Sequence, residues 1–196
     1  ILFTGDHGDM LGNHGFYEKT VFYEDSAKIP LILVPHSEYK PTLHHQIDNR
    51  LAVQADIMPT LLELCDIAIP TSVEGNSLLD QDTRTYVYGE HSENAFATRM
   101  IRDTRYKLIY YPVGNHYQLF DIQNDPKEME NIYDDRAYAD VKENLVRLLV
   151  QNLYGTDLDW LDGDDLNGSP DIEYTPQPER GLHGQRGWRF MQRAGP

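Results

Sequence analysis

Residues 1–34, ILFTGDHGDMLGNHGFYEKTVFYEDSAKIPLILV, place two apolar segments on either side of a loop rich in Asp, His and Gly. The apolar run of residues 1–3 predicts that residues 1–4 end a buried strand, and the apolar run of residues 31–34 is typical of a strand buried in a parallel sheet. Residues 17–27 between them predict a loop and a short helix. The order of strand, helix and strand favours the closing part of an α/β domain.

The segment QADIMPTLLELCDI, residues 54–67, predicts a helix with Asp56 at its N-cap and Pro59 in its first turn. Apolar side chains recur along one face of this helix. Cys65, the single cysteine of the chain, excludes an internal disulfide. Its apolar neighbours predict a small buried side chain.

The pattern changes at about residue 85 to four short runs with β-branched and aromatic residues: TYVYGEH (85–91), ATRMIRD (97–103), YKLIYYP (106–112) and YQLFDI (117–122). Such runs with short polar breaks predict an antiparallel meander. A stripe of Val and Leu between residues 141 and 149 then predicts a helix.

Three parts are therefore predicted: residues 1–80 as the end of the α/β domain, 81–155 as a small antiparallel sheet with a helix, and 156–196 as an acidic, irregular segment. The 17 Lys and Arg against 32 Asp and Glu leave a formal net charge of -15. This balance argues against a nucleic-acid partner, which needs clustered positive charge. No stretch approaches the roughly 18 apolar residues of a membrane span.

The chemistry of the sequence is concentrated after the first strand. Asp6 and His7 occupy the position where functional side chains follow a strand, and both are potential metal ligands. Gly5 and Gly8 allow the backbone to turn and to approach closely. A hard cation such as calcium takes about six or more oxygen ligands, so further ligands must come from elsewhere.

Lys19 lies close enough in sequence to return to the same site, where its ammonium could offset charge on a tetrahedral anion. His14 could donate a hydrogen bond to that anion or act as a general acid. Taken alone, each has an ordinary alternative: Lys19 as a solvated side chain and His14 as a capping or core residue.

Together these residues resemble a family pattern. The stretch from residue 3 to residue 33 resembles the sulfatase family of the alkaline phosphatase superfamily, whose members carry T-S/G-D-H-G, then L-G-x-H-G, then a lysine, then a segment close to Y-E-x-S-x-x-x-P-L-I. The resemblance extends over roughly residues 1–153. It implies an alkaline-phosphatase-like α/β domain followed by a four-stranded antiparallel sheet with a C-terminal helix.

The resemblance also implies site roles. Asp6 and His7 match metal ligands, with Ca²⁺ as the family's metal and Mn²⁺ or Mg²⁺ as alternatives. Lys19 matches a lysine that contacts the sulfate, and His14 matches a position near the substrate. Asp9 falls where a side chain would face the organic part of the substrate.

The family's nucleophile is a formylglycine made within a C/S-x-P-x-R motif, and Cys65 does not match that motif. The formylglycine is therefore expected outside this chain, which by itself should be inactive. The leading hypothesis is the C-terminal portion of a metal-dependent sulfatase acting on a small-molecule or carbohydrate sulfate ester. The alternatives are a phosphate or phosphonate ester hydrolase of the same superfamily and an inactive truncated module used for binding. Cellular location and oligomeric state stay open.

Overall fold

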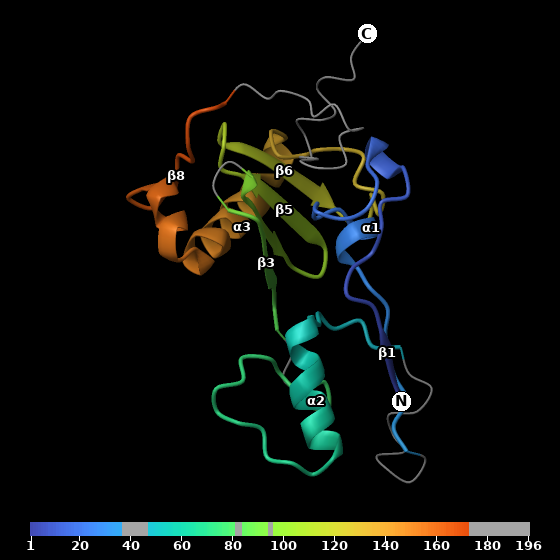
Figure 1. The fold of residues 1–196 in the computed structure, drawn as a ribbon. Helices are drawn as coiled ribbons and strands as arrows, with labels where there is room; N and C mark the ends of the chain where they lie inside the picture. Colours follow the sequence, from blue (N-terminus) through green and yellow to red (C-terminus); the bar gives the residue numbers. More distant parts are fainter. Residues whose placement is uncertain (37–46, 81–83, 94–95, 173–196) are drawn as a thin grey trace. The chain divides into compact units, whose positions relative to one another are not determined.

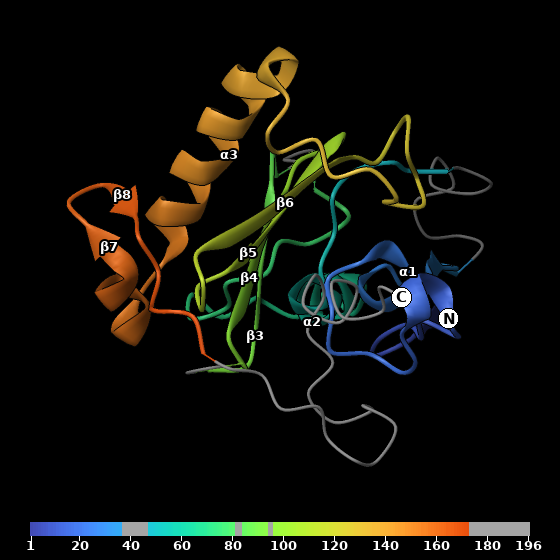
Figure 2. The same cartoon turned by 90° about the horizontal axis from the view of Figure 1, so that it is seen from above.

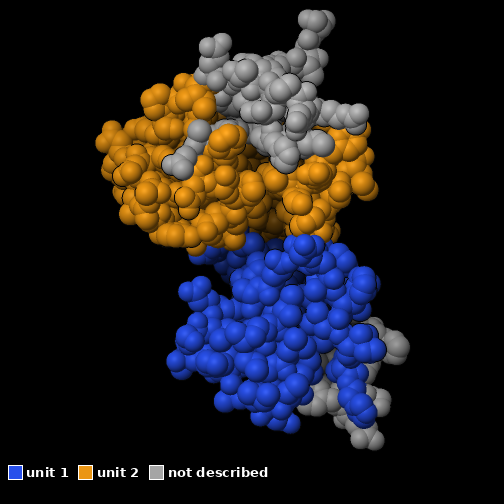
Figure 3. Space-filling view, viewed as in Figure 1, with its two compact units in different colours: residues 1–6, 29–87 blue, residues 7–28, 88–196 orange. Residues whose placement is uncertain are grey.

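The computed structural model describes residues 1–36, 47–80, 84–93 and 96–172. The chain divides into two compact units, shown in different colours in Figure 3. The first consists of residues 1–6 and 29–87, and the second of residues 7–28 and 88–196. Residues 173–196, part of the predicted acidic segment, lie outside the described residues.

The first unit contains the two predicted apolar strands, β1 (Leu2–Thr4) and β2 (Leu31–Leu33). They pair with each other in antiparallel fashion, with Leu2 opposite Leu33. The prediction of strands of the parallel-sheet kind is therefore wrong for this pair. Apolar composition indicates a strand, but the direction of pairing depends on the route of the chain between strands, which composition does not reveal.

The helix of the first unit, α2 (Ile57–Leu64), follows the 3-10 turn η3 (Gln54–Asp56). Asp56 directly precedes α2, as predicted, but its buried carboxylate makes contacts beyond the helix. It accepts hydrogen bonds from the backbone N–H groups of Val53 at 2.8 Å and Asn76 at 2.9 Å, and it pairs with Arg84. Asp56 therefore ties the start of the helix to the chain that follows it.

Cys65 is exposed, so the prediction of a buried cysteine is wrong. Helix α2 ends at Leu64, and Cys65 is its C-cap. A residue just beyond the last helical turn need not continue the apolar face of the helix, which explains the error.

The second unit is built on a four-stranded sheet in the order β3-β4-β5-β6 (Figure 1). The strands are β3 (Val87–His91), β4 (Thr98–Arg102), β5 (Tyr106–Tyr111) and β6 (His116–Asp121). β5 pairs antiparallel with both β4 and β6. The predicted meander is confirmed, each strand falling within one of the four runs or within one residue of it.

The two faces of this sheet have different coverings. Alternation along β5 turns Lys107 and Tyr111 to one face and Leu108 and Tyr110 to the other. Helix α3 (Ala139–Asn152), preceded by η5 (Arg136–Tyr138), lies on one side, and the short helix α1 (Glu24–Ala27) lies on the opposite side (Figure 2). The segment of residues 7–28 therefore covers the Lys107 face.

The described start of the acidic segment is regular. It contains η6 (Gly155–Trp160) and a small hairpin of β7 (Leu161–Asp162) and β8 (Asp165–Leu166). Asp157 accepts two hydrogen bonds from the buried guanidinium of Arg99, at 2.6 and 2.8 Å. The sequence predicted no regular structure here, because acidic composition gives no sign of a buried cation on β4.

None of the helices in the described ranges has the length and apolar character required to cross a membrane.

We expect Leu149→Ala to destabilise the second unit by about 2–5 kcal/mol, because it removes a fully buried side chain of α3 from the core. The urea midpoint of unfolding measures this loss. The matched control is Met129→Ala, at a side chain that is 73% exposed. Equal losses in the two variants would contradict the assignment of this core.

Candidate active-site loop

Asp6, the first predicted metal ligand, is exposed and follows β1 in the first unit. The side-chain amide of Gln54 donates hydrogen bonds to the backbone carbonyls of Gly5 at 3.2 Å and Asp6 at 2.7 Å. Gln54 therefore holds the main chain at the predicted ligand. Sequence reasoning missed Gln54, because nothing in its position before a helix indicates a partner some 48 residues away.

His7, the second predicted ligand, is exposed and begins the second unit. Its Nδ1 lies 2.7 Å from the carbonyl oxygen of Gly8. Because a carbonyl only accepts, Nδ1 carries the proton of this hydrogen bond, and a neutral ring then has its lone pair on Nε2. A histidine held in this way at one nitrogen is typical of metal ligands that bind through the other.

Asp6 and His7 offer a carboxylate and an imidazole as metal donors. In the part of the chain that the structure describes, no group of three or more His, Cys, Asp or Glu residues is arranged to hold a metal ion. The two residues thus stay predicted ligands of a site that needs further donors.

The loop of residues 7–28 starts with a close backbone crossing at Gly8. The Gly8 N–H donates to the carbonyl of Ser26 at 2.8 Å. A Cβ at residue 8 would lie 2.0 Å from the carbonyl oxygen of Asp25. A larger residue would therefore force the backbone at residue 8 away from the backbone at residue 25. The sequence suggested that Gly8 serves approach to an ion, whereas the structure shows approach to the main chain.

Asp9 organises the interior of the loop. Its Oδ1 accepts hydrogen bonds from the N–H groups of Leu11 at 2.9 Å and Glu18 at 3.1 Å. The Met10 N–H donates to the Glu18 carbonyl at 2.8 Å. The predicted contact of Asp9 with substrate stays a prediction, and the contacts that the structure gives its carboxylate close the loop.

Lys19 lies between two residues with left-handed backbone angles. Its neighbours Glu18 and Thr20 have φ angles of 62° and 88°, in the left-handed region that a β-branched residue rarely enters. Each such residue costs on the order of 1–3 kcal/mol, and strain of this kind is concentrated at functional sites. Lys19 is exposed, and among the described residues its ammonium has no hydrogen-bond or ion-pair partner. The loop therefore presents a positive charge that is available to an anion.

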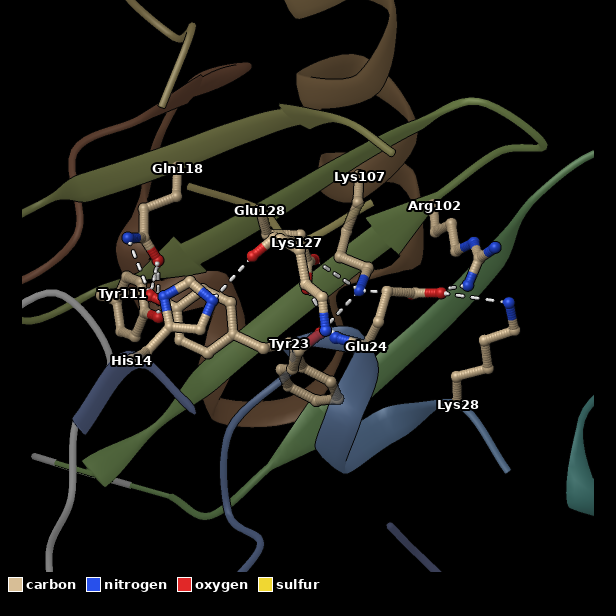
Figure 4. Close-up of polar contacts among 11 residues, drawn as sticks. His14, Tyr23, Glu24, Lys28, Arg102, Lys107, Tyr111, Gln118, Lys127 and Glu128 are labelled. Carbon is tan, nitrogen blue, oxygen red and sulfur yellow. Dashed lines mark hydrogen bonds and ion pairs between the residues drawn. The ribbon is translucent and has the colours of Figure 1, made fainter. Parts of the chain in front are cut away.

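His14, the other predicted catalytic residue, is attached to the second unit by its ring. The ring stacks on Tyr23 with centroids 4.2 Å apart, and its Nε2 lies 2.8 Å from the Lys127 carbonyl (Figure 4). Nε2–H must donate this hydrogen bond, which leaves the lone pair of the neutral ring on Nδ1. The catalytic role of His14 stays a prediction, and any proton transfer by the neutral ring would involve Nδ1.

Tyr23 is a buried support for His14. Its hydroxyl exchanges hydrogen bonds with the side-chain amide of Gln118, which also accepts from Tyr111. Burial raises the pKa of Tyr23 to about 12, so it stays neutral and can donate. His14 thus rests on a neutral, hydrogen-bonded platform on β5 and β6.

The chain is similar to known proteins over most of its length. Residues 12–154 match the model of the family described as N-sulphoglucosamine sulphohydrolase, C-terminal. An arylsulfatase of Clostridium perfringens is 33% identical over 172 residues, which cover 85% of this chain and 36% of the relative. The chain thus spans about a third of the length of this relative.

Two solved structures share the fold. One, in complex with its substrate D-glucosamine-2-N,6-O-disulfate, has a TM-score of 0.62 and 25% identity over 84% of this chain and 35% of that one. A phosphonate monoester hydrolase of Agrobacterium radiobacter has a TM-score of 0.62 and 26% identity over 82% of this chain and 36% of that one. With the family match over most of its length, the chain belongs to the sulfatase family and corresponds to its C-terminal portion.

Proposed function

We propose that the protein carrying this chain hydrolyses sulfate monoesters, with Asp6 and His7 as metal ligands and Lys19 as a contact to the sulfate. The observation that carries the proposal is the exposed ammonium of Lys19, without a partner among the described residues and flanked by two left-handed residues. Membership of the sulfatase family supports the choice of anion.

The residues of this chain fit the needs of a sulfate ester. Lys19 would place positive charge beside the sulfate oxygens, where negative charge develops as the S–O bond to the alcohol breaks. His14 donates through Nε2 to the Lys127 carbonyl, so its Nδ1 would donate to the same anion or to the leaving oxygen from the doubly protonated ring.

A divalent metal fits the donors at residues 6 and 7. Asp6 would supply a carboxylate oxygen and His7 its Nε2, because Nδ1 is held by the Gly8 carbonyl. The metal, when bound, supplies Lewis-acid charge to the sulfate oxygens. Ca²⁺ is our first choice, and Mn²⁺ or Mg²⁺ are alternatives that the same donor types permit.

The nucleophile of the reaction would be a formylglycine outside this chain. Cys65 is the single cysteine, and the Asp-Ile-Ala that follows it does not form the C/S-x-P-x-R motif. Because the chain covers only 36% of its arylsulfatase relative, we propose that the 196-residue chain alone is inactive and that activity belongs to the longer protein.

A carbohydrate sulfate is the substrate class that we favour, since one structural neighbour was solved with a disulfated glucosamine as its substrate. The phosphonate monoester hydrolase among the neighbours supports the second candidate, a phosphate or phosphonate ester hydrolase. Turnover of matched sulfate, phosphate and phosphonate esters by the full-length protein decides between them. The sulfatase proposal fails if the sulfate ester is the poorest of the three. A protein inactive on all three would favour the binding module.

We expect Lys19→Ala to lower kcat of the full-length protein on a sulfate ester by about a hundredfold to a thousandfold, because a charge aimed at the transition state is lost. Steady-state kinetics measure the change. The control is Lys142→Ala, whose ammonium lies 4.4 Å from the Tyr133 ring on another part of the unit. A kcat in Lys19→Ala equal to that of the control would rule out the proposed contact.

We expect Asp6→Ala to abolish divalent metal binding and Gln54→Ala to weaken it roughly 10- to 100-fold, since Gln54 holds the backbone of the ligand. Titration calorimetry with Ca²⁺ on the metal-free full-length protein measures both effects independently of turnover. Gln151→Ala, at an exposed glutamine of α3, is the control. Unchanged affinity in Asp6→Ala would exclude Asp6 as a ligand.

A further inference from the structure

Among the described residues of the second unit, Lys107 is the most deeply buried charged residue. Lys107 lies near the start of β5, an inner strand of the sheet, and is almost completely buried. Its Nζ contacts the Phe22 carbonyl at 2.8 Å, a Glu128 carboxylate oxygen at 2.7 Å and a Glu24 carboxylate oxygen at 2.6 Å (Figure 4). An ammonium has three protons, so every donor of Lys107 has an acceptor.

Two of these acceptors belong to the loop that carries His7, His14 and Lys19. Phe22 and Glu24 flank Tyr23, the residue on which His14 stacks. Lys107 therefore holds the loop by a main-chain carbonyl and a side chain on either side of the His14 support.

Glu128 also holds the loop at Glu24, through the backbone N–H of that residue. One of its carboxylate oxygens accepts from Lys107, and the other accepts from the backbone N–H of Glu24 at 2.6 Å. Glu128 is nearly fully buried and has a left-handed φ of 55°. The preceding residue, Lys127, contributes the carbonyl that holds His14. The consecutive residues Lys127 and Glu128 thus bind the loop at His14 and at Glu24.

Lys107, Glu24 and Glu128 form a cluster of charges, in which the two carboxylates are compensated to different extents. Burial acts to raise the pKa of Glu24, but the charge and hydrogen bond of Lys107 and the charge of Arg102 outweigh it and hold this pKa below its ordinary value. Burial raises the pKa of Glu128, and Lys107 offsets only part of this effect. Glu24 also has Arg102 at 2.7 Å and Lys28 at 4.0 Å, whereas Lys107 is the one ion-pair partner of Glu128 among the described residues.

Stability alone does not account for such a cluster. Buried ion pairs are often replaced by apolar side chains at little cost, because desolvation offsets most of their attraction. Fixed hydrogen bonds from charged groups do, however, select one geometry of the segments that they join. Here the joined segments are the sheet and the main chain at residues 22 and 24.

We propose that Lys107 and Glu128 are positioning residues, which fix the loop of residues 7–28 on the sheet and thereby place Lys19 and His14 for the reaction. This inference rests on the proposed function for its kinetic consequence only. Its structural part, the dependence of the loop on the pair, stands independently.

The test compares the double variant Lys107→Met/Glu128→Gln with wild type in the full-length protein. The variant removes both charges of the pair together, and Glu24, which loses Lys107, keeps Arg102 and Lys28 as ion-pair partners. The matched control is Arg99→Met/Asp157→Asn, which removes another buried ion pair of the same unit, one that joins β4 to η6 and has no contact with the loop.

We expect amide hydrogen exchange within residues 8–28 to accelerate about tenfold or more in the Lys107/Glu128 variant, because the loop opens locally. We expect kcat on a sulfate ester to fall about tenfold to a hundredfold, since small displacements of reacting groups have effects of this size. The control should leave both quantities within about twofold of wild type at a temperature where both variants are folded.

The proposal is overturned if exchange in residues 8–28 is unchanged, or if the control pair accelerates it equally. If the double variant does not fold, Glu128→Gln alone decides by the same two measurements. It keeps the shape of the side chain, removes its charge and replaces one of its two acceptor oxygens by an NH2 donor, so one of the two hydrogen bonds to Lys107 and Glu24 is lost. A wild-type protein inactive on sulfate esters would refute the proposed function, and the exchange experiment would still decide whether the pair positions the loop.

Discussion

A cation enclosed by protein must have an acceptor for each of its protons, and Lys107 meets this constraint with two carboxylates and one backbone carbonyl. The acceptors come from two distant parts of the sequence, residues 22–24 and residue 128. The charge near the start of β5 therefore determines where the loop of residues 7–28 can lie on the sheet. The stacking of His14 on Tyr23 and its hydrogen bond to Lys127 follow from that placement.

The loop itself divides structural and chemical tasks among neighbouring residues. Gly8 and Asp9 make backbone contacts that close the loop, while Tyr23 and Glu24 attach it to the sheet. Lys19 takes no part in either task within the described residues and is exposed between two left-handed neighbours. The separation is what a binding site requires, because a side chain used to hold the loop together could not also exchange its partner for a ligand.

Much of the second unit could be predicted from sequence because its signals are local. The strands from residue 87 to residue 121 and helix α3 follow from apolar alternation, aromatic residues and helical spacing. Asp6, His7, His14 and Lys19 were selected as site residues from one short motif, and their chemical roles stay predictions. The family resemblance was confirmed over residues 12–154.

What could not be predicted depends on partners far away in the chain. No periodic pattern in the sequence indicates the antiparallel pairing of β1 and β2. The same holds for the ion pair of Asp157 with Arg99 and for the hydrogen bond from the Gln54 amide to the Asp6 backbone. Lys107 is the clearest case, since a lysine in a strand is ordinarily assigned to a solvent-exposed face. Its burial is understandable only when Glu24 and Glu128 are both in place.

The hydrogen bond between the Glu24 N–H and Glu128 joins residues 104 positions apart, and that between His14 and Lys127 spans 113. During synthesis the loop of residues 7–28 leaves the ribosome long before its partners, and it cannot make either bond until residue 128 has emerged. Contacts of such long range also form slowly, because the intervening chain must close first. The segment that bears Lys19 is therefore made well before the residues that hold it, and it can make these two contacts only after residues 127 and 128 have emerged.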